Sequence, residues 1–576
     1  MKNAEISELF DEMADIMEIL GEDVFRINSY RRVARVIGDM PRDVEEMLAT
    51  GKLEETPGIG ESSLAKIEEF IKTGKVTAHK GLLKKIPVTL LELLKIPGMG
   101  PKGVKAVYEN LKVKSIAGLK KVIENGKLAT LPGFGEKKAR LIAKGINFLE
   151  TSTGRIRLDQ AFEAANTVIK FLKGIEGVGK IQFAGSLRRY AETIGDVDIL
   201  VTGKNGKAII DAFAGAGFVQ QVLAAGDTKG SAIINTSTTE VHVDVRVVED
   251  KSFGSALNYF TGSKQHNVRM REIAIKHKLK LNEYGLFSGE RMVAGKTEQE
   301  IYKKLGLDYV EPIMREDRGE IEAAANHKLP KLVRLADIGG DFHTHTVASD
   351  GVCEIEEMVE AARDRGYKFI CITDHSESSA IANGLTPARL VKHIKRIHKI
   401  GSRYKDIAVF AGMEVDILAD GKLDYDNKIL AELDFVIGSI HSGLASPREK
   451  VTMRTLKAMD NPYLHCIGHP TGRLLGEREP MDLDMEAVIK HAAETGTAME
   501  INANPYRLDL KDVHVKMAIE AGVKLIIVTD LHYTAQLAYM GFGVATAGRG
   551  WATKDDVVNT MPVARLETWL AGKKKN

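Results

Sequence analysis

Two short stretches of the chain alternate between apolar and polar side chains, the pattern of a strand with one buried face. In residues 196–201 (DVDILV), Asp196 and Asp198 fall on one face, opposite three apolar side chains. In residues 241–247 (VHVDVRV), four valines alternate with Asp244 and two other polar residues. Because successive side chains of a strand point to opposite faces, each stretch predicts a strand with its carboxylates on one face. If the strands are neighbours, Asp244 joins the first pair as a trio.

Three neighbouring carboxylates repel one another, and divalent cations are the usual compensation. A trio that holds two Mg²⁺ ions can activate a hydroxyl group and stabilise a leaving phosphate. A lone Asp-x-Asp pair is more often a solvated sheet face. The segment upstream favours the metal site, because a turn at Gly185 and Ser186 opens a short helix whose N–H groups suit a triphosphate. Arg188 and Arg189 add positive charge beside it.

Residues 1–150 show the periodicity of amphipathic helices and no convincing alternating strand. A phrase of the form Pro-Gly-x-Gly recurs three times within them, each time followed by an amphipathic helix with early basic residues. Glycines let the backbone approach a phosphate closely, and the helix that follows offers free N–H donors. One copy would be a plain helix–helix turn, but three copies predict binding of a nucleic-acid backbone. Their glycines are Gly58, Gly60, Gly98, Gly100, Gly133 and Gly135.

After Asp337, short apolar runs end in polar or ionisable residues and alternate with helical stretches. Seven such alternations predict a parallel barrel with its functional groups at the carboxyl ends of the strands. A single histidine there is more often a packed core residue, but nine nitrogen and oxygen ligands suit two or three Zn²⁺ or Mn²⁺ ions. They are His343, His345, Asp350, His375, Glu414, His441, His469, Asp530 and His532. Arg473, in HPTGR, is either a phosphate ligand or a helix-cap or surface residue.

Composition sets the broad class of the protein. With 576 residues the chain is too long for one core, and we expect roughly three to five domains. No apolar run approaches the length of a membrane span, the N-terminus is acidic, unlike a signal peptide, and three cysteines give no disulfide framework. These features favour a reducing cytoplasm.

The net charge of +2 hides an asymmetry along the chain. Residues 24–150 carry 24 Lys and Arg against 14 Asp and Glu, whereas residues 336–576 carry 29 against 34. A basic front half suits a polyanionic partner and an acidic back half suits bound cations, although solvated helix faces give the same sums.

The segments GSLRRYAETIGDVDIL, from Gly185, and FGSALNYFTGSKQHN, from Phe253, resemble the palm and nucleotide-binding element of family X DNA polymerases. The resemblance implies that Asp196 and Asp198 bridge two Mg²⁺ or Mn²⁺ ions and that Asp244 lies nearest the primer 3′-OH. The implied nucleotide-binding residues are Gly185, Ser186, Arg189, Gly195, Tyr259, Phe260, Gly262 and Asn267, and Arg271 is implied to contact the template.

The N-terminal phrases resemble helix-hairpin-helix motifs, which grip the DNA backbone without reading its sequence. The first, with VFRINSYRRVARVI before it, resembles the lyase domain of DNA polymerase beta and its relatives. On that resemblance Lys66 would be a catalytic Schiff-base lysine, although Ser62 and Ala78 stand where the family has phosphate-binding lysines. A lyase nucleophile must be a neutral amine, which needs a lowered pKa. We expect binding of a gap or a 5′ end to be its role rather than lyase activity.

The back half resembles the PHP (polymerase and histidinol phosphatase) family, and all nine positions of that family's metal motif are filled. The resemblance implies an active phosphoesterase. The order of motifs along nearly the whole chain is that of bacterial and archaeal family X polymerases with a C-terminal PHP domain. It predicts a multidomain fold: an all-α helix-hairpin-helix region, an α/β nucleotidyltransferase palm and thumb, and a distorted (β/α)7 PHP barrel.

The expected domains follow from these motifs. They are a lyase-like DNA-binding domain (1–90), a fingers-like domain with the second and third hairpins (91–150), a palm (151–255), a thumb (256–325), a linker (326–338) and a PHP domain (339–576).

Three functions fit these motifs. The first is a DNA repair polymerase that binds gapped, nicked or primer–template DNA as a monomer, adds dNTPs, and removes 3′ nucleotides at the PHP site. The second is a nucleotidyltransferase for another acceptor, such as tRNA ends, with an appended phosphatase. The third is a DNA-binding scaffold with dead active sites. The hairpins and YFTGS count against the second, and the complete ligand sets count against the third.

Overall fold

The computed structural model describes the chain except for residues 1, 39, 41–43, 55, 57, 88, 95, 97–98, 137, 140–141, 144–145, 147–154 and 574–576. The chain divides into two compact units. The first holds residues 1–156, 166–179 and 203–247, and the second holds residues 157–165, 180–202 and 248–576. None of the described helices is long and apolar enough to cross a membrane.

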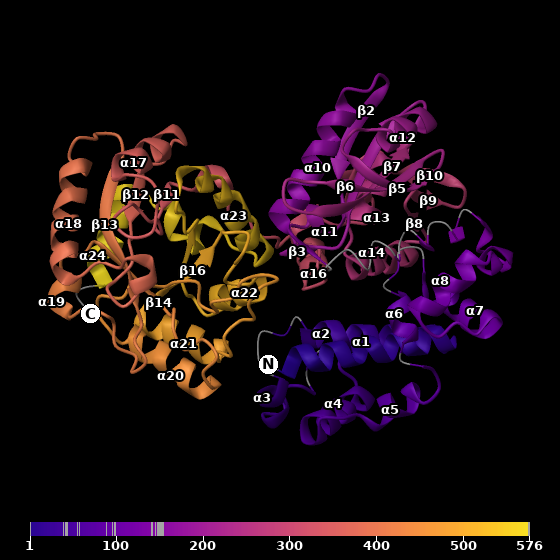
Figure 1. Ribbon diagram of the computed structural model, residues 1–576, viewed down its shortest axis with the longest axis horizontal. Helices are drawn as coiled ribbons and strands as arrows, with labels where there is room; N and C mark the ends of the chain where they lie inside the picture. Colours follow the sequence, from indigo (N-terminus) through magenta and orange to yellow (C-terminus); the bar gives the residue numbers. More distant parts are fainter. Residues whose placement is uncertain are drawn as a thin grey trace. The chain divides into compact units, whose positions relative to one another are not determined.

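The N-terminal part is helical, as its periodicity predicts, and its described residues before Ile156 contain no strand (Figure 1). Apolar side chains from its helices, among them Phe10, Val33 and Leu93, form one continuous buried core. Local sequence sets several helix ends: Pro101 opens α7, and Gly74 ends α4 with a φ of 66°. The helices are α1 (Lys2–Leu20), α2 (Val24–Gly38), α3 (Val44–Ala49), α4 (Glu61–Thr73), α5 (Thr77–Leu83), α6 (Leu90–Leu94), α7 (Pro101–Leu111) and α8 (Ile116–Glu124).

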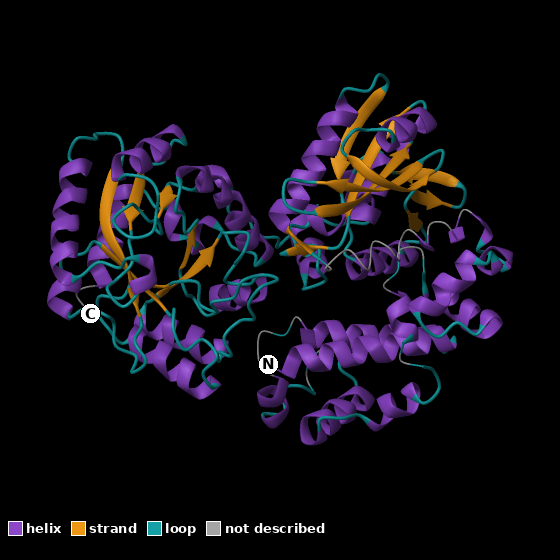
Figure 2. Ribbon diagram, in the orientation of Figure 1, coloured by secondary structure: helices purple, strands orange, loops and turns teal. Residues whose placement is uncertain are grey.

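A five-stranded sheet has the strand order β2-β4-β7-β6-β5 (Figure 2). Its strands are β2 (Val178–Phe183), β4 (Val197–Gly203), β5 (Val219–Ala225), β6 (Lys229–Asn235) and β7 (Glu240–Val248), and β5, β6 and β7 pair antiparallel. The neighbouring elements are α10 (Leu158–Lys173), α11 (Gly185–Arg188), α12 (Gly206–Ala214) and a small pair of strands, β1 (Ile156–Arg157) and β3 (Thr193–Ile194).

The two strands that the alternation predicts are both present, but they differ in burial. In β7 the valines are buried and the intervening polar residues are half-buried, so the alternation is complete. In β4, Leu200 and Thr202 are buried as well as the predicted apolar face. Leu200 lies in one buried cluster with Phe253 and Leu257 of α13 (Phe253–Thr261), a helix that comes after β7 and covers the second face. The alternation therefore predicted β4 correctly but did not predict that a helix covers part of its polar face.

Residues 253–325 form helices around a three-stranded antiparallel sheet. Tyr302, Met270 and Leu286 lie in their shared core. The elements are α13 (Phe253–Thr261), α14 (Lys264–Lys276), β8 (Lys280–Asn282), β9 (Gly285–Ser288), β10 (Arg291–Ala294), α15 (Glu298–Lys304) and α16 (Glu320–Ala325).

The C-terminal part is a seven-stranded parallel sheet, in the order β11 to β17, with helices outside it (Figure 2). A parallel bridge between Thr344 and Leu531 joins the chain just beyond the first and last strands. This is the predicted (β/α)7 barrel. The strands are β11 (Gly340–Asp341), β12 (Phe369–Ile372), β13 (Ala408–Asp416), β14 (Phe435–Ser439), β15 (Cys466–Ile467), β16 (Ala498–Asn502) and β17 (Leu525–Val528).

Two apolar layers hold the barrel together. Outside, side chains of the helices pack on the strands in a large buried cluster. Inside, Phe342, Phe369 and Phe435 fill the interior, and Leu566 and Leu570 of the last helix join them. The helices are α17 (Ile355–Asp364), α18 (Pro387–Gly401), α19 (Asn427–Leu430), α20 (Arg448–Met459), α21 (Met485–Thr495), α22 (Asp512–Glu520), α23 (Met540–Arg549) and α24 (Val563–Lys573).

Candidate metal centre and nucleotide cavity

The structure brings together all nine residues of the predicted metal set. Each lies in a barrel strand near its carboxyl end or in the loop just beyond, where a parallel barrel gathers functional groups. His343, His345 and Asp350 follow β11, His375 follows β12, Glu414 lies in β13, His441 follows β14, His469 follows β15, and Asp530 and His532 follow β17. Most of them line a cavity of about 610 Å³.

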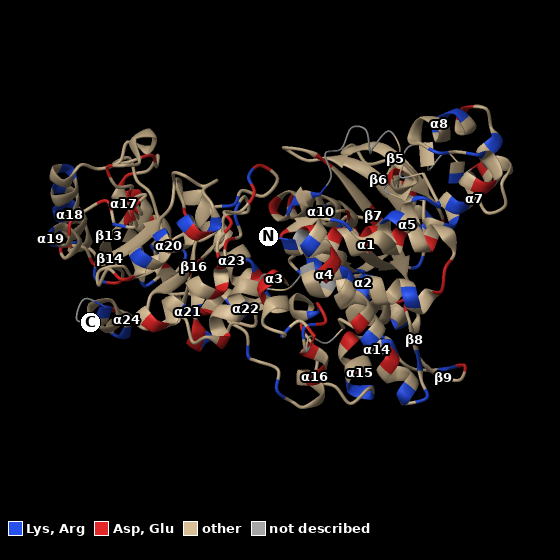
Figure 3. Cartoon of the chain, turned by 90° about the horizontal axis from the view of Figure 1, so that it is seen from below, with Lys and Arg blue, Asp and Glu red and all other residues tan. Residues whose placement is uncertain are grey.

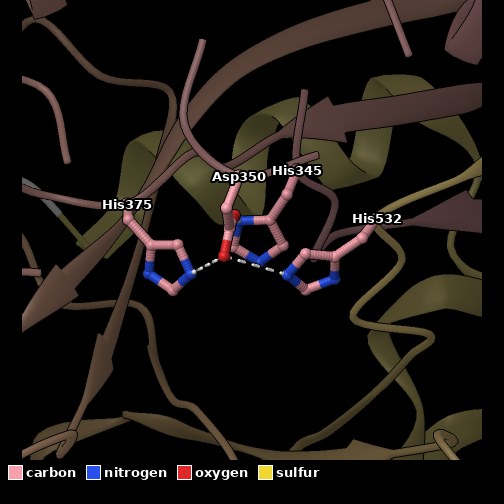
Figure 4. Close-up of side chains that lie close together, drawn as sticks. All are labelled: His345, Asp350, His375 and His532. Atoms are coloured by element: carbon pink, nitrogen blue, oxygen red, sulfur yellow. Dashed lines mark ion pairs between the residues drawn. The ribbon is translucent and has the colours of Figure 1, made fainter. Parts of the chain in front are cut away.

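Figure 4 shows the first of three candidate ligand groups, in which three imidazoles surround the Asp350 carboxylate. Asp350 Oδ2 lies 3.4 Å from His532 Nε2 and 3.5 Å from His375 Nε2, and Asp350 Oδ1 lies 3.8 Å from His345 Nδ1. One ligand atom from each of the four residues falls within 4.8 Å of the others. Such a group can hold one ion.

The other two groups share residues with the first. His345 also groups with His343 and Asp530, and His375 also groups with Glu414 and His441. Glu414 is the common neighbour: its Oε2 lies 2.8 Å from His375 Nδ1 and 3.4 Å from His343 Nε2. Its Oε1 lies 2.9 Å from Nε2 of His469, the ninth residue. The shared members place the three groups side by side.

Several atoms of this cluster are buried without a hydrogen-bond partner, which is a direct test of whether metal ions fit. They are both ring nitrogens of His345, Nε2 of His343, Nδ1 of His469, and the facing pair His375 Nδ1 and Glu414 Oε2, whose 2.8 Å contact lacks the angles of a hydrogen bond. An unsatisfied buried polar group costs about 1–3 kcal/mol. Metal coordination removes that cost, and imidazole and carboxylate donors suit Zn²⁺ or Mn²⁺. The residues therefore fit a metal centre.

Electrostatics within the cluster keeps its carboxylates charged. Burial alone would raise the pKa of Glu414, but the imidazoles of His375 and His343 hold that pKa well below its usual range. Burial and the neighbouring His375 lower the pKa of His345 to about 4, so His345 is neutral at pH 7. Burial also opposes the charged form of His375, yet the Glu414 carboxylate raises its pKa to about 10. The cluster thus offers anionic oxygens and a central neutral imidazole.

A second cavity, of about 260 Å³, lies where the sequence predicts a nucleotide pocket. Its lining residues are Arg189, Tyr259, Phe260, Thr261, Gly262, Lys264, Asn267 and Arg271. Tyr259 is 40% exposed, and its ring packs edge-on against Phe260 with the centroids 5.0 Å apart. Asn267 Nδ2 donates to the Tyr259 carbonyl at 2.7 Å, while its Oδ1 is buried without a hydrogen-bond partner. An aromatic wall beside a free amide oxygen suits a nucleoside.

The two arginines of the GSLRR segment are engaged with protein groups. Arg188 forms two hydrogen bonds to Glu298, at 2.7 and 2.9 Å. Arg189 donates from Nε to Glu316 at 3.0 Å and from Nη1 to the Thr261 carbonyl, and its side chain lines the cavity of about 260 Å³. Arg188 therefore secures α11 on α15, a role that the sequence did not indicate.

Asp198 and the glycine turn are packed tightly against each other. The Ala184 N–H donates to the Asp198 carbonyl at 2.8 Å. Gly185 has a φ of 63°, and a Cβ on it would lie 2.6 Å from Asp198 Oδ2. Only glycine fits here, because both the left-handed backbone and the close carboxylate exclude a side chain. Asp196 and Gly195 are exposed beside this turn, and Ser186 is half-buried in α11.

Asp244 is held in the ionised form. Its Oδ2 lies 2.6 Å from Lys229 Nζ and its Oδ1 lies 3.2 Å from His242 Nε2. Burial would raise the pKa of Asp244, but the hydrogen bond from His242 and the charge of Lys229 hold it well below its usual range. Asp244 is therefore a carboxylate at neutral pH, as metal binding requires.

Family models match four parts of the chain. A DNA polymerase beta thumb matches residues 256–316, a PHP domain matches residues 341–504, and helix-hairpin-helix models match residues 1–76 and 90–147. The DNA polymerase/3′-5′ exonuclease PolX of Bacillus subtilis (strain 168) is 35% identical over 572 residues, which cover 99% of each chain.

The chain belongs to the family X DNA polymerases that carry a PHP domain.

Other relatives of this family X polymerase match its C-terminal part. A probable phosphatase of Thermoanaerobacter sp. (strain X514) is 28% identical over 246 residues, which cover 41% of this chain and 95% of that protein. A probable phosphatase of Caldicellulosiruptor bescii is 33% identical over 210 residues, 34% of this chain and 81% of that protein. The matched region, which contains the barrel, thus covers most of each of these two proteins.

The hairpins of the family X N-terminal region have the backbone that the sequence predicts where it is described. Gly60 and Gly100 are the residues that precede α4 and α7, and Gly58, Gly133 and Gly135 have positive φ. Gly98 lies outside the described residues. Figure 3 shows Lys and Arg on α5, α7 and α8, as a DNA-binding region needs.

Lys66 lies on the exposed face of α4. Its Nζ donates to the Ser62 carbonyl at 2.7 Å and to Ser62 Oγ at 2.8 Å, and lies 5.6 Å from the centre of the Tyr30 ring. Ser62 thus orients the side chain of Lys66.

Two carboxylates that orient histidines of the predicted metal set were not predicted from the sequence. Glu500 Oε2 lies 2.8 Å from His343 Nδ1, and Asp416 Oδ1 lies 2.9 Å from His441 Nδ1. Such partners fix the tautomer and orientation of a ligand histidine. The alternation of side chains along β13 could have identified Asp416, because it lies two residues after Glu414 and therefore on the same face of that strand.

Proposed function

We propose that this chain is a DNA repair polymerase that fills short gaps and also removes nucleotides from DNA 3′ ends at a separate PHP site. The observation that carries the proposal is that the imidazole and carboxylate groups of the barrel lie on a different sheet from Asp198 and Asp244, which the adjacent strands β4 and β7 carry. The full-length similarity to a protein named DNA polymerase/3′-5′ exonuclease supports it.

For nucleotide addition, Asp196, Asp198 and Asp244 would hold two Mg²⁺ or Mn²⁺ ions. The strand order, in which β4 is next to β7, supports this grouping. When bound, such ions activate the primer 3′-OH and neutralise charge on the triphosphate. Gly185 and Ser186 would bind phosphate oxygens through backbone N–H groups, with Gly195 beside them.

The base and sugar of the incoming dNTP would occupy the cavity of about 260 Å³. Tyr259 and Phe260 would pack under them, with Gly262 in the adjoining turn. Asn267 would contact the minor-groove edge of the base by donating from Nδ2, because that edge presents acceptor atoms in every base pair. Arg271, on the same wall, would contact the template strand.

For 3′-end removal, the nine barrel residues would hold two or three Zn²⁺ or Mn²⁺ ions. When bound, such ions would supply a hydroxide at neutral pH and stabilise the negative charge that develops on the phosphoryl oxygens. The protein's part is to present ligands in fixed orientations: Glu500 holds His343 through Nδ1 and Asp416 holds His441 through Nδ1. The apolar core inside the barrel is buried from water.

The glycine turns of residues 1–150 would bind DNA through its phosphate backbone. The protein would act as a monomer. We place the lyase-like domain at 1–90, the fingers-like domain at 91–150, the palm at 151–255, the thumb at 256–325, the linker at 326–338 and the PHP domain at 339–576. Models matching 1–76, 90–147, 256–316 and 341–504 support this order.

Template-directed insertion into a one-nucleotide gap tests the proposal. Asp244→Ala should reduce insertion by roughly a thousandfold, because it removes a metal ligand. Asp211→Ala, an exposed aspartate of α12, is the matched control and should leave insertion unchanged. Equal nucleotide addition to RNA ends without a template would instead support a different acceptor and refute gap filling.

A further inference from the structure

One positively charged side chain, that of Arg507, lies in the cavity of the predicted metal set. Arg507 lies in the loop that follows β16 and lines the cavity of about 610 Å³ together with the metal-binding residues. Among the described residues that line this cavity, it is the sole Lys or Arg. Its placement therefore concerns whatever anion enters the cavity.

The backbone of Arg507 is held on both sides of its Cα. Its N–H donates to the Asn504 carbonyl at 2.7 Å, and its own carbonyl accepts from Arg473 Nε at 2.9 Å. Arg473 also donates from Nη2 to the Leu508 carbonyl and to Glu192. Arg473, which the sequence offered as a phosphate ligand, is therefore occupied by backbone carbonyls, and its effect is to fix the loop that carries Arg507.

The guanidinium of Arg507 is only partly satisfied. Its Nε lies 3.2 Å from Asp530 Oδ2, and Asp530 is a member of the metal set. Its Nη1 is buried and has no hydrogen-bond partner. The side chain as a whole is 18% exposed, and it lines the cavity. A charged N–H group left unpaired in a buried position is costly, and a ligand that accepts from it removes that cost.

The free edge matches the chemistry of a phosphodiester. A guanidinium is a planar fork whose N–H groups pair with the oxygens of a phosphate, and such charge-assisted bonds strengthen as negative charge grows. During hydrolysis, water oxygen bonds to phosphorus, the bond from phosphorus to the 3′ oxygen breaks, and that oxygen takes a proton. The phosphoryl oxygens carry more negative charge midway than at the start, so a donor beside them favours the transition state.

We propose that Arg507 binds a non-bridging oxygen of the phosphate cleaved at the PHP site, with Asp530 holding its other edge and Arg473 positioning its loop. The proposal rests on the proposed hydrolytic function of the barrel. The ligand class is a phosphate monoester or diester, and inorganic phosphate is its simplest member.

The test uses the full-length, metal-loaded enzyme and two readouts. Titration calorimetry with inorganic phosphate measures anion binding without turnover, and 3′ degradation of a single-stranded oligonucleotide measures hydrolysis. Arg507→Gln should weaken phosphate binding at least tenfold and lower kcat/KM for degradation by roughly a hundredfold, the effect of losing one preorganised donor. Arg507→Lys, which keeps the charge and loses the fork, should restore part of the phosphate affinity.

Metal content, gap filling and one control variant complete the design. Arg507→Gln should retain the metal content and the gap filling of the parent enzyme, and Arg565→Gln, an exposed arginine of α24, should match the parent in every assay. Phosphate affinity unchanged in Arg507→Gln overturns the proposal, and so does a loss of bound metal, which would make Arg507 a support for Asp530. A parent enzyme that binds phosphate through Arg507 but degrades no DNA would refute the 3′-end function alone.

Discussion

Replacing Glu500 with glutamine should weaken metal binding while leaving the barrel folded. Glu500 is fully buried, and its Oε2 accepts from His343 Nδ1 at 2.8 Å. A carboxylate can only accept, so Nδ1 of His343 carries a proton, and with a metal ion bound its Nε2 would present the lone pair to the cavity. Nε2 is buried without a hydrogen-bond partner, as a metal ligand is in the absence of the ion.

The amide introduced by Glu500→Gln can keep part of the original network. Glu500 Oε1 accepts from the His469 N–H and from Asn502 Nδ2, both at 2.9 Å, and the amide oxygen can preserve these bonds. The amide nitrogen then faces His343 Nδ1 and donates to it, which moves the imidazole proton to Nε2 and blocks the metal-binding lone pair. Loss of such an outer partner costs roughly 10- to 100-fold in metal affinity, or about 1.4–2.7 kcal/mol.

Competition with a chromophoric chelator, followed by mass spectrometry of bound metal, measures this affinity. Glu494→Gln, an exposed residue of α21, is the matched control. The thermal unfolding midpoint of the metal-free protein should change little, because the variant keeps its volume and most of its hydrogen bonds. Metal affinity equal to that of the parent protein would refute the assigned orientation of His343.

Three further predictions follow from contacts elsewhere in the chain. Gly185→Ala should abolish gap filling and leave 3′ degradation intact, because its Cβ would fall 2.6 Å from Asp198 Oδ2; steady-state assays of both activities check this. Glu298 is buried, and although burial would raise its pKa, Arg315 and Arg188 lower it to about 2. The ionised carboxylate of Glu298 therefore stabilises the fold above pH 4.5, its pKa in the unfolded chain, and this stabilisation is lost as the pH falls towards 2. In acid titrations of unfolding, Glu298→Gln should remove on the order of 3 kcal/mol of this pH-dependent free energy. DNA binding should weaken linearly on a log–log plot against salt concentration, and a flat plot would exclude backbone contacts as its basis.

The features that could be predicted are those that depend on residues close together in the sequence. The alternation of valines around Asp244 predicts β7, and the recurring strand ends from His343 to His532 predict the barrel. The structure has both. The nine residues of the predicted metal set could be named because most of them lie within a few residues of a strand end, where the fold itself brings them close together.

The rest depends on contacts between residues far apart in the sequence. Arg188 lies beside the glycine turn in the chain, yet its partner is Glu298, 110 residues away. Arg473 and Arg507 are equally suited to bind phosphate by residue type, and only the folded loop shows which of them has a free N–H group. Side-chain direction in loops is set by tertiary packing, so the sequence pattern carries no signal for it.

The independence of the two centres is tested most directly by measuring both activities on one gapped substrate. Four proteins are compared: the parent enzyme, Asp244→Asn, His345→Ala and the double variant. We predict that Asp244→Asn loses nucleotide insertion and keeps metal-dependent 3′ degradation, that His345→Ala shows the reverse, and that the double variant has neither. A single substitution that removes both activities would contradict the account.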